Sequence, residues 1–509
     1  MKLVVKICFV FVIIWGFSQL THAQDKSQEI DLLVQKLVDR GQFNGVVLVE
    51  HEGKVIYRNA TGFANFEQKR ELQIDTSFDT ASISKTFTAM SVMILAERGK
   101  LKYEDALAKY FPELPYQGIT IRHLLTHTSG LPEYFDIYFN KFKQWDKSKI
   151  LKNTDLIELF QTEKPALRFA PGEKFEYSNT AFCFLASIVE KVSGQKYEQF
   201  LQDNIFKPLE MNNTRIVSKL SNDPPNFARQ YLQPELLSAK FVSPDNFPNT
   251  YFVITFGGLV GDGSVSSTVE DLYKWGKSFD TEKLVSRKTI EEAWTKGILK
   301  DGSEAKTLIG ARAPGDFSGY GYGWFIRDGA NDSKVYWHTG GWAGYVNYFH
   351  RNPKLKQTII LLSNASNSGV SRLAHTIEKV LSNQPYETPK TPIANALVKT
   401  ILEDGGEASV KLYRDLKTTK SNEYIFSPNQ LNALGYELLG QKKFKDAIAL
   451  FKLNVEEYPK DGNLYDSLGE AYMLNGDKDL AIKNYEKSLE LAPKNQNAAE
   501  MLKKLRQPE

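Results

Sequence analysis

Residues 46–58 read Val-Val-Leu-Val-Glu-His-Glu-Gly-Lys-Val-Ile-Tyr-Arg, and this stretch sets the fold class that we expect. The runs 46–50 and 55–58 are rich in β-branched and aromatic side chains, and a polar segment with Gly53 lies between them. Such a pattern is typical of two strands joined as a β-hairpin. The sequence therefore predicts a hairpin near the start of the folded part of the chain.

A second group of β-rich runs lies far away in the sequence, at 320–327, 334–351 and 357–363. Between the two groups the chain shows mostly helical patterns and loops with Gly and Pro. The simplest closure puts both groups of strands in one antiparallel sheet with helices packed on it. We therefore predict an α/β fold, an antiparallel β-sheet flanked by helices, over residues 26–385.

The first residues have the pattern of a secretory signal peptide. Lys2 and Lys6 form a basic start, an apolar stretch follows over 7–17, and Thr-His-Ala ends the segment with a small residue. The apolar stretch is too short to span a bilayer as a helix. We therefore expect residues 1–23 to be removed, which leaves a periplasmic or secreted protein without a membrane span.

Charge and cysteine content exclude other classes of protein. Loss of Lys2 and Lys6 takes the 64 basic residues to 62 against 61 acidic ones, so the mature chain is nearly neutral and no nucleic-acid partner is indicated. Cys8 leaves with the signal peptide, and Cys183 is then alone. An exported chain with one cysteine has no internal disulfide.

The C-terminal part repeats itself after a linker that we place at 386–393. Three small or turn-forming residues recur 34 positions later (469 − 435 = 34), namely Gly435, Ala447 and Pro459 as Gly469, Ala481 and Pro493. This is the period of the tetratricopeptide (TPR) repeat. We predict an all-α domain over 394–509 with TPR-like repeats at 428–461 and 462–495; two unrelated helical hairpins are the alternative.

The helices within 394–420 have a separate role in this interpretation. About three repeat units are normally needed to bury a continuous core. We therefore expect these helices either to cap the array or to dock it on the preceding domain. The repeat surface is the predicted binding site for a protein or peptide partner.

Ser82-Ile83-Ser84-Lys85 opens a helix, so Ser82 and Lys85 lie one turn apart on the same face. A serine hydroxyl needs a base to become a nucleophile, and a nearby lysine lowers that cost. The helix N-terminus adds partial positive charge where an oxyanion forms. The spacing alone is weak, because Ser303 and Lys306 in a polar, turn-like segment share it.

Tyr177 and Asn179 lie two residues apart, after a Pro-Gly loop and before an apolar helix. A tyrosine beside a lysine ammonium can be held partly as phenolate and act as a base. Asn179 can hold a substrate amide and orient Lys85. Taken singly, a buried tyrosine and a capping asparagine are the better explanation of these two residues.

The third element is His338-Thr339-Gly340-Gly341, within a strand-like run. A strand with a small residue here can lie against an extended acyl substrate, and the Gly341 N–H can pair with that of Ser82 as an oxyanion hole. Taken singly, His338 is better explained as a packed histidine or a turn histidine. The three elements follow one another at separations of 95 (177 − 82) and 161 (338 − 177).

These motifs resemble the class C β-lactamase and low-molecular-weight penicillin-binding (DD-peptidase) family. The stretches 123–131, 208–214 and 261–268 look like further landmarks of the family, so the resemblance covers about 26–385. It implies the following roles: Ser82 as acylated nucleophile, Lys85 and Tyr177 as the proton-transfer pair, and Asn179 with His338, Thr339, Gly340 and Gly341 as the substrate-binding residues. The resemblance does not decide which of Lys85 and Tyr177 is the base. No metal or cofactor is implied.

The sequence departs from the lactamases at His338, where they usually have lysine. Near neutral pH a histidine supplies mainly a hydrogen bond, so a fixed cation for a substrate carboxylate is lost. There is also no E-x-x-L-N segment for a deacylating water. The departure favours a DD-peptidase, a D-amino-acid peptidase or an esterase over a dedicated β-lactamase, and penicillin is expected to acylate Ser82 slowly and remain bound.

Three rival interpretations carry less weight. A metal hydrolase is suggested by His123 and His127, but no glutamate lies between them and no third ligand cluster follows. An α/β-hydrolase lacks its G-x-S-x-G motif. A catalytically dead binding module is opposed by the presence of every expected catalytic residue. We therefore predict an exported serine hydrolase acting on D-amino-acid peptides, esters or β-lactams.

Overall fold

The computed structural model describes residues 25–141, 149–220, 223–238, 240–246, 252–308 and 318–507. The predicted signal peptide lies outside these residues. The chain divides into two compact units, the first made of Met1–Leu232 with Phe241–Tyr386 and the second of Gln233–Lys240 with Glu387–Glu509. In the described part of the chain, no helix is both long and apolar enough to cross a membrane.

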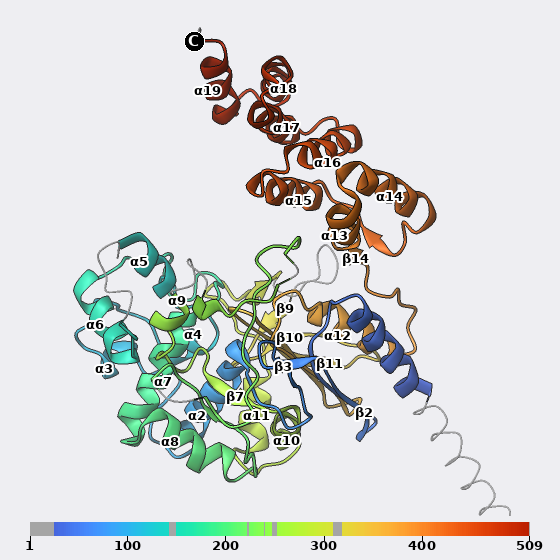
Figure 1. Cartoon of the computed structure of the whole chain (residues 1–509). Coiled ribbons are helices and arrows are strands. Elements are labelled where there is room, and N and C mark those ends of the chain that lie inside the picture. The colour runs from blue at the N-terminus through green and yellow to red at the C-terminus, as the bar shows by residue number, and fades with distance from the viewer. Residues whose placement is uncertain are drawn as a thin grey trace, which may run out of the picture. The chain divides into compact units, whose positions relative to one another are not determined.

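The first unit is built on an eight-stranded sheet with the order β2-β1-β13-β12-β11-β10-β9-β8, in which every pair is antiparallel (Figure 1). The strands are β1 (Gly45–His51), β2 (Lys54–Thr61), β8 (Lys306–Thr307), β9 (Ser318–Tyr320), β10 (Phe325–Asp328), β11 (Lys334–Trp342), β12 (Tyr345–Asn352) and β13 (Gln357–Ser363). The N-terminal hairpin joins the late strands where β1 pairs with β13. This confirms the prediction that the two β-rich groups share one antiparallel sheet.

Helices cover both faces of this sheet. Tyr348 and Phe349 are neighbours on β12, so their side chains point to opposite faces. A Cβ placed on Gly276 of α10 (Val269–Ser278) would lie 3.0 Å from the Phe349 ring. The Tyr348 ring meets His375 of α12 (Val370–Leu381) at a centroid distance of 5.8 Å. The unit is therefore a sheet with a helical layer on each side.

The helical layer that includes α10 also contains α2 (Ser84–Glu97), whose residues Ser84 to Leu95 are all buried. A helix that is buried on every side lacks the amphipathic pattern of a surface helix. The other helices are one at 25–39, η1 (Ala81–Ile83), α3 (Leu107–Tyr110), α4 (Ile121–Leu125), α5 (Tyr134–Lys141), α6 (Asn153–Glu163), α7 (Asn179–Ser193), α8 (Tyr197–Leu201), the π-turn η2 (Gln202–Phe206), η3 (Pro244–Asn246), α9 (Phe252–Thr255) and α11 (Arg287–Ala293).

Two small sheets complete the unit. One pairs β3 (Phe63–Asn65) with β4 (Arg70–Glu71). The other has the order β5-β7-β6, with β5 (Phe78–Asp79), β7 (Val265–Ser267) and β6 (Arg215–Ile216). Strand β5 leads directly into η1 and α2, so this small sheet fixes the chain just before Ser82.

Among the described residues of the second unit, the regular elements are helices and one parallel pair of two-residue strands, β14 (Thr391–Pro392) and β15 (Tyr424–Ile425). Its helices are α13 (Ile393–Asp404), α14 (Gly406–Thr419), α15 (Pro428–Gly440), α16 (Phe444–Glu457), α17 (Gly462–Asn475), α18 (Lys478–Leu491) and α19 (Gln496–Leu505). The repeated glycines lie against aromatic rings: a Cβ would come within 2.4 Å of Phe451 at Gly435 and 3.1 Å of Tyr485 at Gly469. Small residues thus let the two helices of each repeat approach, as the 34-residue period predicts.

Two further segments belong to the second unit. Helix α14 extends the repeat array, because the Gly406 N–H donates to Asp446 of α16 at 2.7 Å. Residues 233–240 also group with this unit. The N–H groups of Leu236 and Leu237 donate to the two carboxylate oxygens of Glu437 at 3.0 and 2.9 Å. No sequence pattern indicated this excursion, since we expected all of 26–385 to form one body.

Candidate active site

Ser82 lies in a strained turn between β5 and α2. The preceding residue, Ala81, has φ +48°, a left-handed conformation that a side chain disfavours. Its N–H donates to the Asp79 carboxylate at 2.8 Å, which holds the turn. The turn presents Ser82 to a cavity of about 300 Å³.

Lys85 is fully buried one turn after Ser82. Its ammonium donates to Ser82 Oγ at 3.2 Å, to Asn179 Oδ1 at 2.8 Å and to the Asp262 carbonyl oxygen at 2.7 Å. An ammonium group has three protons, so each finds an acceptor. The structure therefore brings together the predicted Ser82, Lys85 and Asn179.

Tyr177 lies on the other side of the lysine, which sits 5.0 Å from the centre of its ring. The side chains of Ser82 and Lys85 lie near its hydroxyl and lower the pKa of the phenol. Burial raises the pKa of Tyr177, and this outweighs the lowering by the Lys85 charge and by the Ser82 hydroxyl. Tyr177 is therefore a neutral phenol at rest, unlike the partly ionised phenol that its lysine neighbour led us to expect.

The strand β11 passes close to Ser82 because of its glycines. A Cβ on Gly340 would lie 2.0 Å from the Thr80 carbonyl oxygen, so any side chain there would push the strand away. Gly341 has open space beside it and lines the same cavity as Ser82. The Asn347 amide strengthens this junction by donating to the Asp79 carbonyl at 2.9 Å.

His338, by contrast, is buried with both ring nitrogens engaged. Nδ1 lies 2.6 Å from the Thr339 carbonyl oxygen and must donate to it, so Nε2 accepts from the Tyr320 hydroxyl at 3.1 Å. Burial lowers the pKa of His338 to about 3, and the Lys85 charge adds to this effect. The ring is neutral and has no nitrogen left for a substrate, so contacts along this strand fall to Thr339 and the two glycines.

His123 and His127, the pair behind the metal-hydrolase alternative, have local structural partners. His123 Nδ1 accepts from the Thr120 N–H at 3.1 Å, and His127 Nδ1 accepts from the Ser178 N–H at 3.0 Å. The His127 ring also lies against Tyr177 at a centroid distance of 4.3 Å. Within the described ranges, no three His, Cys, Asp or Glu side chains are placed to hold a metal ion.

The cavity above Ser82 is lined by aromatic side chains and by charges that are mostly paired. Its lining includes Tyr134, Phe135, Phe256, Trp342 and Tyr345, with the charged residues Asp79, Asp223, Asp245, Asp262, Lys219 and Arg229. Lys219 pairs with Asp245 at 2.8 Å, and Arg229 lies 3.9 Å from Asp223. Both lining cations thus have a carboxylate partner.

Two acidic residues of the site were not singled out from the sequence. The Asp262 carboxylate accepts from the Tyr134 hydroxyl at 2.9 Å and from the Cys183 thiol at 3.3 Å, while its carbonyl holds Lys85. Glu133 binds Asn179. Both lie in or next to stretches that drew attention as motifs, 261–268 and 123–131, but nothing local marks their partners.

Comparison with known proteins agrees with this geometry. Residues 30–383 match the model of the Beta-lactamase family, and residues 462–495 match that of the tetratricopeptide repeat. The chain belongs to the Beta-lactamase family. This confirms the resemblance that the motifs suggested, and it makes the chain a member of a fold family of serine hydrolases.

Relatives in the Beta-lactamase family include penicillin-binding protein 4* of Bacillus subtilis (strain 168), which is 34% identical over 72% of this chain and 79% of its own length. A penicillin-binding protein homologue from Pyrococcus abyssi has a TM-score of 0.58 and 26% identity, covering 70% of this chain and 77% of its own. The D-amino acid amidase of Ochrobactrum anthropi SV3 shares the fold, with a TM-score of 0.56, 22% identity, and coverage of 70% and 98%.

Proposed function

We propose that this chain is an exported hydrolase that forms an acyl-enzyme on Ser82 and cleaves amide or ester bonds, with D-amino-acid peptides as the first substrate class. The observation that carries the proposal is a cluster at the wall of the cavity, in which Lys85 donates to Ser82 and Asn179 and lies over the Tyr177 ring. A nucleophile, a proton-transfer pair and an orienting group are the parts that covalent catalysis by serine requires.

In this mechanism Lys85 or Tyr177 first gives up a proton to solvent. The amine or phenolate so formed then accepts the proton of Ser82 Oγ as this oxygen attacks the substrate carbonyl carbon. The N–H groups of Ser82 and Gly341 stabilise the oxyanion. The proton then passes to the leaving nitrogen or oxygen as its bond to carbon breaks. Water attacks the resulting ester, the proton relay runs in reverse, and Ser82 is restored.

The charges of the cavity support a substrate without an essential carboxylate. His338 is neutral, and Lys219 and Arg229 are paired with aspartates. A dedicated β-lactamase needs a cation for the carboxylate of its substrate, so we rank β-lactam hydrolysis behind hydrolysis of D-amino-acid peptides that carry no carboxylate beside the scissile bond. The aromatic lining favours a carboxylesterase as the second candidate, because acyl chains and aryl esters bind well on such surfaces.

The remaining features are parts of the same proposal. Residues 1–23 would direct export to the periplasm or the exterior, and 26–385 would form the hydrolase domain. A linker at 386–393, whose last residues form β14 and the start of α13, would join it to the helical domain 394–509, whose repeats would bind a protein or peptide. The match of the repeat model to 462–495 supports the placement of the second repeat.

The test is intact-protein mass spectrometry after incubation with a fluorophosphonate or with a penicillin. We expect one adduct per chain on wild type and none on Ser82→Ala. Ser303→Ala is the matched control, because Ser303 has the same spacing to a lysine but donates to Asp301 in an exposed turn. A lasting penicillin adduct supports a DD-peptidase, whereas no adduct with either reagent favours a binding module.

A further inference from the structure

Glu133 joins the segment before α5 to the first residue of α7. One carboxylate oxygen accepts from the Asn179 backbone N–H at 2.7 Å, and the other accepts from the Asn179 side-chain Nδ2 at 3.0 Å. The N-terminus of a 15-residue helix such as α7 favours a carboxylate, because its free N–H groups carry partial positive charge. Glu133 therefore binds both the backbone and the side chain of Asn179.

These two hydrogen bonds determine the orientation of the Asn179 side-chain amide. Nδ2 is directed to Glu133, so Oδ1 is directed to Lys85 and accepts from its ammonium at 2.8 Å. If the amide turned over, Nδ2 would face the ammonium and Oδ1 would face the carboxylate, which places donor against donor and acceptor against acceptor. A carboxylate at position 133 excludes that second orientation.

Glu133 is also linked to Lys85, because the Asn179 side chain binds both residues. Asp262 lies near the lysine too, but it offers Lys85 its carbonyl oxygen, and its carboxylate is occupied by Tyr134 and Cys183. We propose that Glu133 is a positioning residue for acylation: by fixing the Asn179 amide, it keeps the Lys85 ammonium directed at Ser82. This inference rests on the proposed function.

A purely structural role for Glu133 is weakened by a second junction between the same elements. The Thr180 hydroxyl donates to the Pro132 carbonyl at 2.9 Å and accepts from the Tyr134 N–H at 2.9 Å. These two bonds tie the residues on either side of Glu133 to α7. Thr180→Val is therefore a matched control that loosens the junction while leaving the Asn179 amide in place.

The first experiment compares the rate of Ser82 labelling by a fluorophosphonate in wild type, Glu133→Gln and Thr180→Val, with thermal melting to measure the folded fraction. In Glu133→Gln, the amide nitrogen faces an N–H of Asn179 and one buried donor loses its acceptor. We expect a rate at least about tenfold lower per folded molecule, against a change of less than about twofold in Thr180→Val. With a turnover substrate, the loss should fall on kcat rather than on KM.

A swapped pair keeps the inference testable if Glu133→Gln is poorly folded. In the double variant Glu133→Gln with Asn179→Asp, the new amide at position 133 accepts from the backbone N–H of residue 179 and donates to the new carboxylate there. That carboxylate then accepts from Lys85, so the hydrogen-bond pattern and the net charge are restored. We expect the double variant to be labelled faster than Asn179→Asp alone, in which the carboxylates of positions 133 and 179 face each other without a proton between them.

The pH profile separates positioning from packing. Burial raises the pKa of Glu133, while bonds from Ser178 and Asn179 and the Lys85 charge lower it and Asp262 raises it further. Tyr134 and Cys183 complete the titratable groups that face it. The wild-type labelling rate should fall as Glu133 gains a proton, and Glu133→Gln should lack that step. Asp79 titrates in both proteins, so the difference between the two profiles is the measurement.

Several outcomes would overturn the inference. One is a Glu133→Gln rate within twofold of wild type at every pH, and another is a loss matched by Thr180→Val. A double variant no faster than Asn179→Asp would have the same meaning. If wild type itself is not labelled on Ser82, the proposed function fails and this inference falls with it, whereas labelled wild type with unaffected Glu133 variants removes the inference alone.

Discussion

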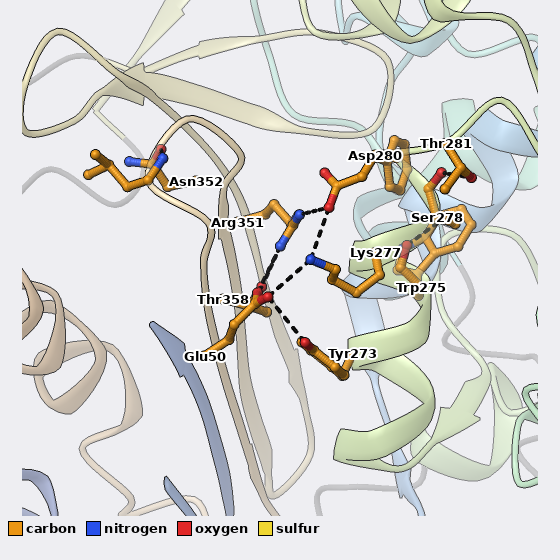
Figure 2. A network of polar contacts seen from close by, with 12 residues as sticks. Glu50, Tyr273, Trp275, Lys277, Ser278, Asp280, Thr281, Arg351, Asn352 and Thr358 are labelled. Atoms are coloured by element: carbon orange, nitrogen blue, oxygen red, sulfur yellow. Dashed lines mark hydrogen bonds and ion pairs between the residues drawn. The ribbon is translucent and has the colours of Figure 1, made fainter. Parts of the chain in front are cut away.

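Two buried polar clusters of the first unit handle charge in opposite ways. In the cluster of Figure 2, Glu50 and Arg351 are fully buried and pair directly at 2.9 Å. The second Glu50 oxygen accepts from Lys277 and Tyr273, each at 3.1 Å, and Asp280 pairs with both Arg351 and Lys277. Two cations and two carboxylates face one another across β1, β12 and α10, and no net charge remains.

The cluster at Ser82 also buries a cation, but it surrounds Lys85 with neutral acceptors. A hydroxyl, an amide oxygen and a carbonyl oxygen hold its three protons, and the Glu133 carboxylate stands one residue away behind Asn179. A cation in direct contact with a carboxylate gains too much from its charge to release a proton readily. The groups in direct contact with a buried cation therefore distinguish a structural cluster from one that can transfer protons.

We expect the largest effect from a substitution that keeps the positive charge of Lys85 but prevents it from transferring a proton. Lys85→Arg keeps the positive charge but replaces the amine with a guanidinium that does not deprotonate in proteins. We expect Ser82 labelling to fall about a thousandfold. Lys277→Arg is the control in the paired cluster and should label at the wild-type rate. Equal rates for the two arginine variants would show that proton transfer does not involve Lys85.

The second-largest effect concerns Tyr177. Its counterpart in the paired cluster, the cluster around Glu50 and Arg351, is Tyr273. Tyr177→Phe removes the hydroxyl beside Ser82 and Lys85, and turnover should fall about a hundredfold without unfolding. Tyr273→Phe removes a hydroxyl bound to Glu50 and should leave the turnover of the folded protein unchanged. Steady-state kinetics together with circular dichroism measures both. Full activity in Tyr177→Phe contradicts the proton-relay role.

The sequence predicted the parts of this molecule that depend on local patterns. The β-rich runs near 46–58 and 334–363 formed strands, and the spacing of Ser82 and Lys85 placed them on one helical turn. The 34-residue shift identified helix pairs whose glycines face aromatic rings. Each of these predictions needs only periodicity or the fixed geometry of a helix or strand.

The rest depends on contacts between residues far apart in the chain. Glu133 and Asn179 are separated by 46 residues, and only folding shows that they meet. The orientation of the His338 ring depends on Tyr320 and on the Thr339 carbonyl, which remove it from the substrate side. The pKa of Tyr177 rises because burial outweighs Lys85, and the degree of burial cannot be counted from a motif.

A stability effect without a catalytic one is expected in the paired cluster. Glu50→Gln leaves Arg351 buried without its full counter-charge, so the free energy of unfolding should fall by about 3 kcal/mol. Denaturant unfolding measures this, and the labelling rate per folded molecule should not change. Glu270→Gln, which breaks an exposed pair with Arg58, should cost less than about 1 kcal/mol. A similar small loss for both variants would mean that the buried cluster is no more stabilising than a surface pair.

The smallest effect is a difference in how the two clusters respond to acid. Burial would raise the pKa of Asp280, but Arg351 and Lys277 hold it below its usual value, so the stability it contributes is present at neutral pH and is lost only as pH falls through that lowered value. Burial raises the pKa of Asp79, beside Ser82, to about 6, and the Asp262 charge adds to this while the Ala81 N–H opposes it.

Asp79 should therefore act on stability with the opposite sign. Between about pH 4 and 6 the folded state holds a proton that the unfolded chain has released, so stability falls as pH rises through this range, by at most about 1.4 kcal/mol per pH unit. Asp79→Asn should remove this slope, whereas Asp280→Asn should leave it and alter only the loss at lower pH. Thermal melting between pH 3 and pH 7 distinguishes the two. An unchanged slope in Asp79→Asn would mean that the carboxylate beside Ser82 is as well compensated as those around Arg351, and the contrast between the clusters would then be confined to Lys85.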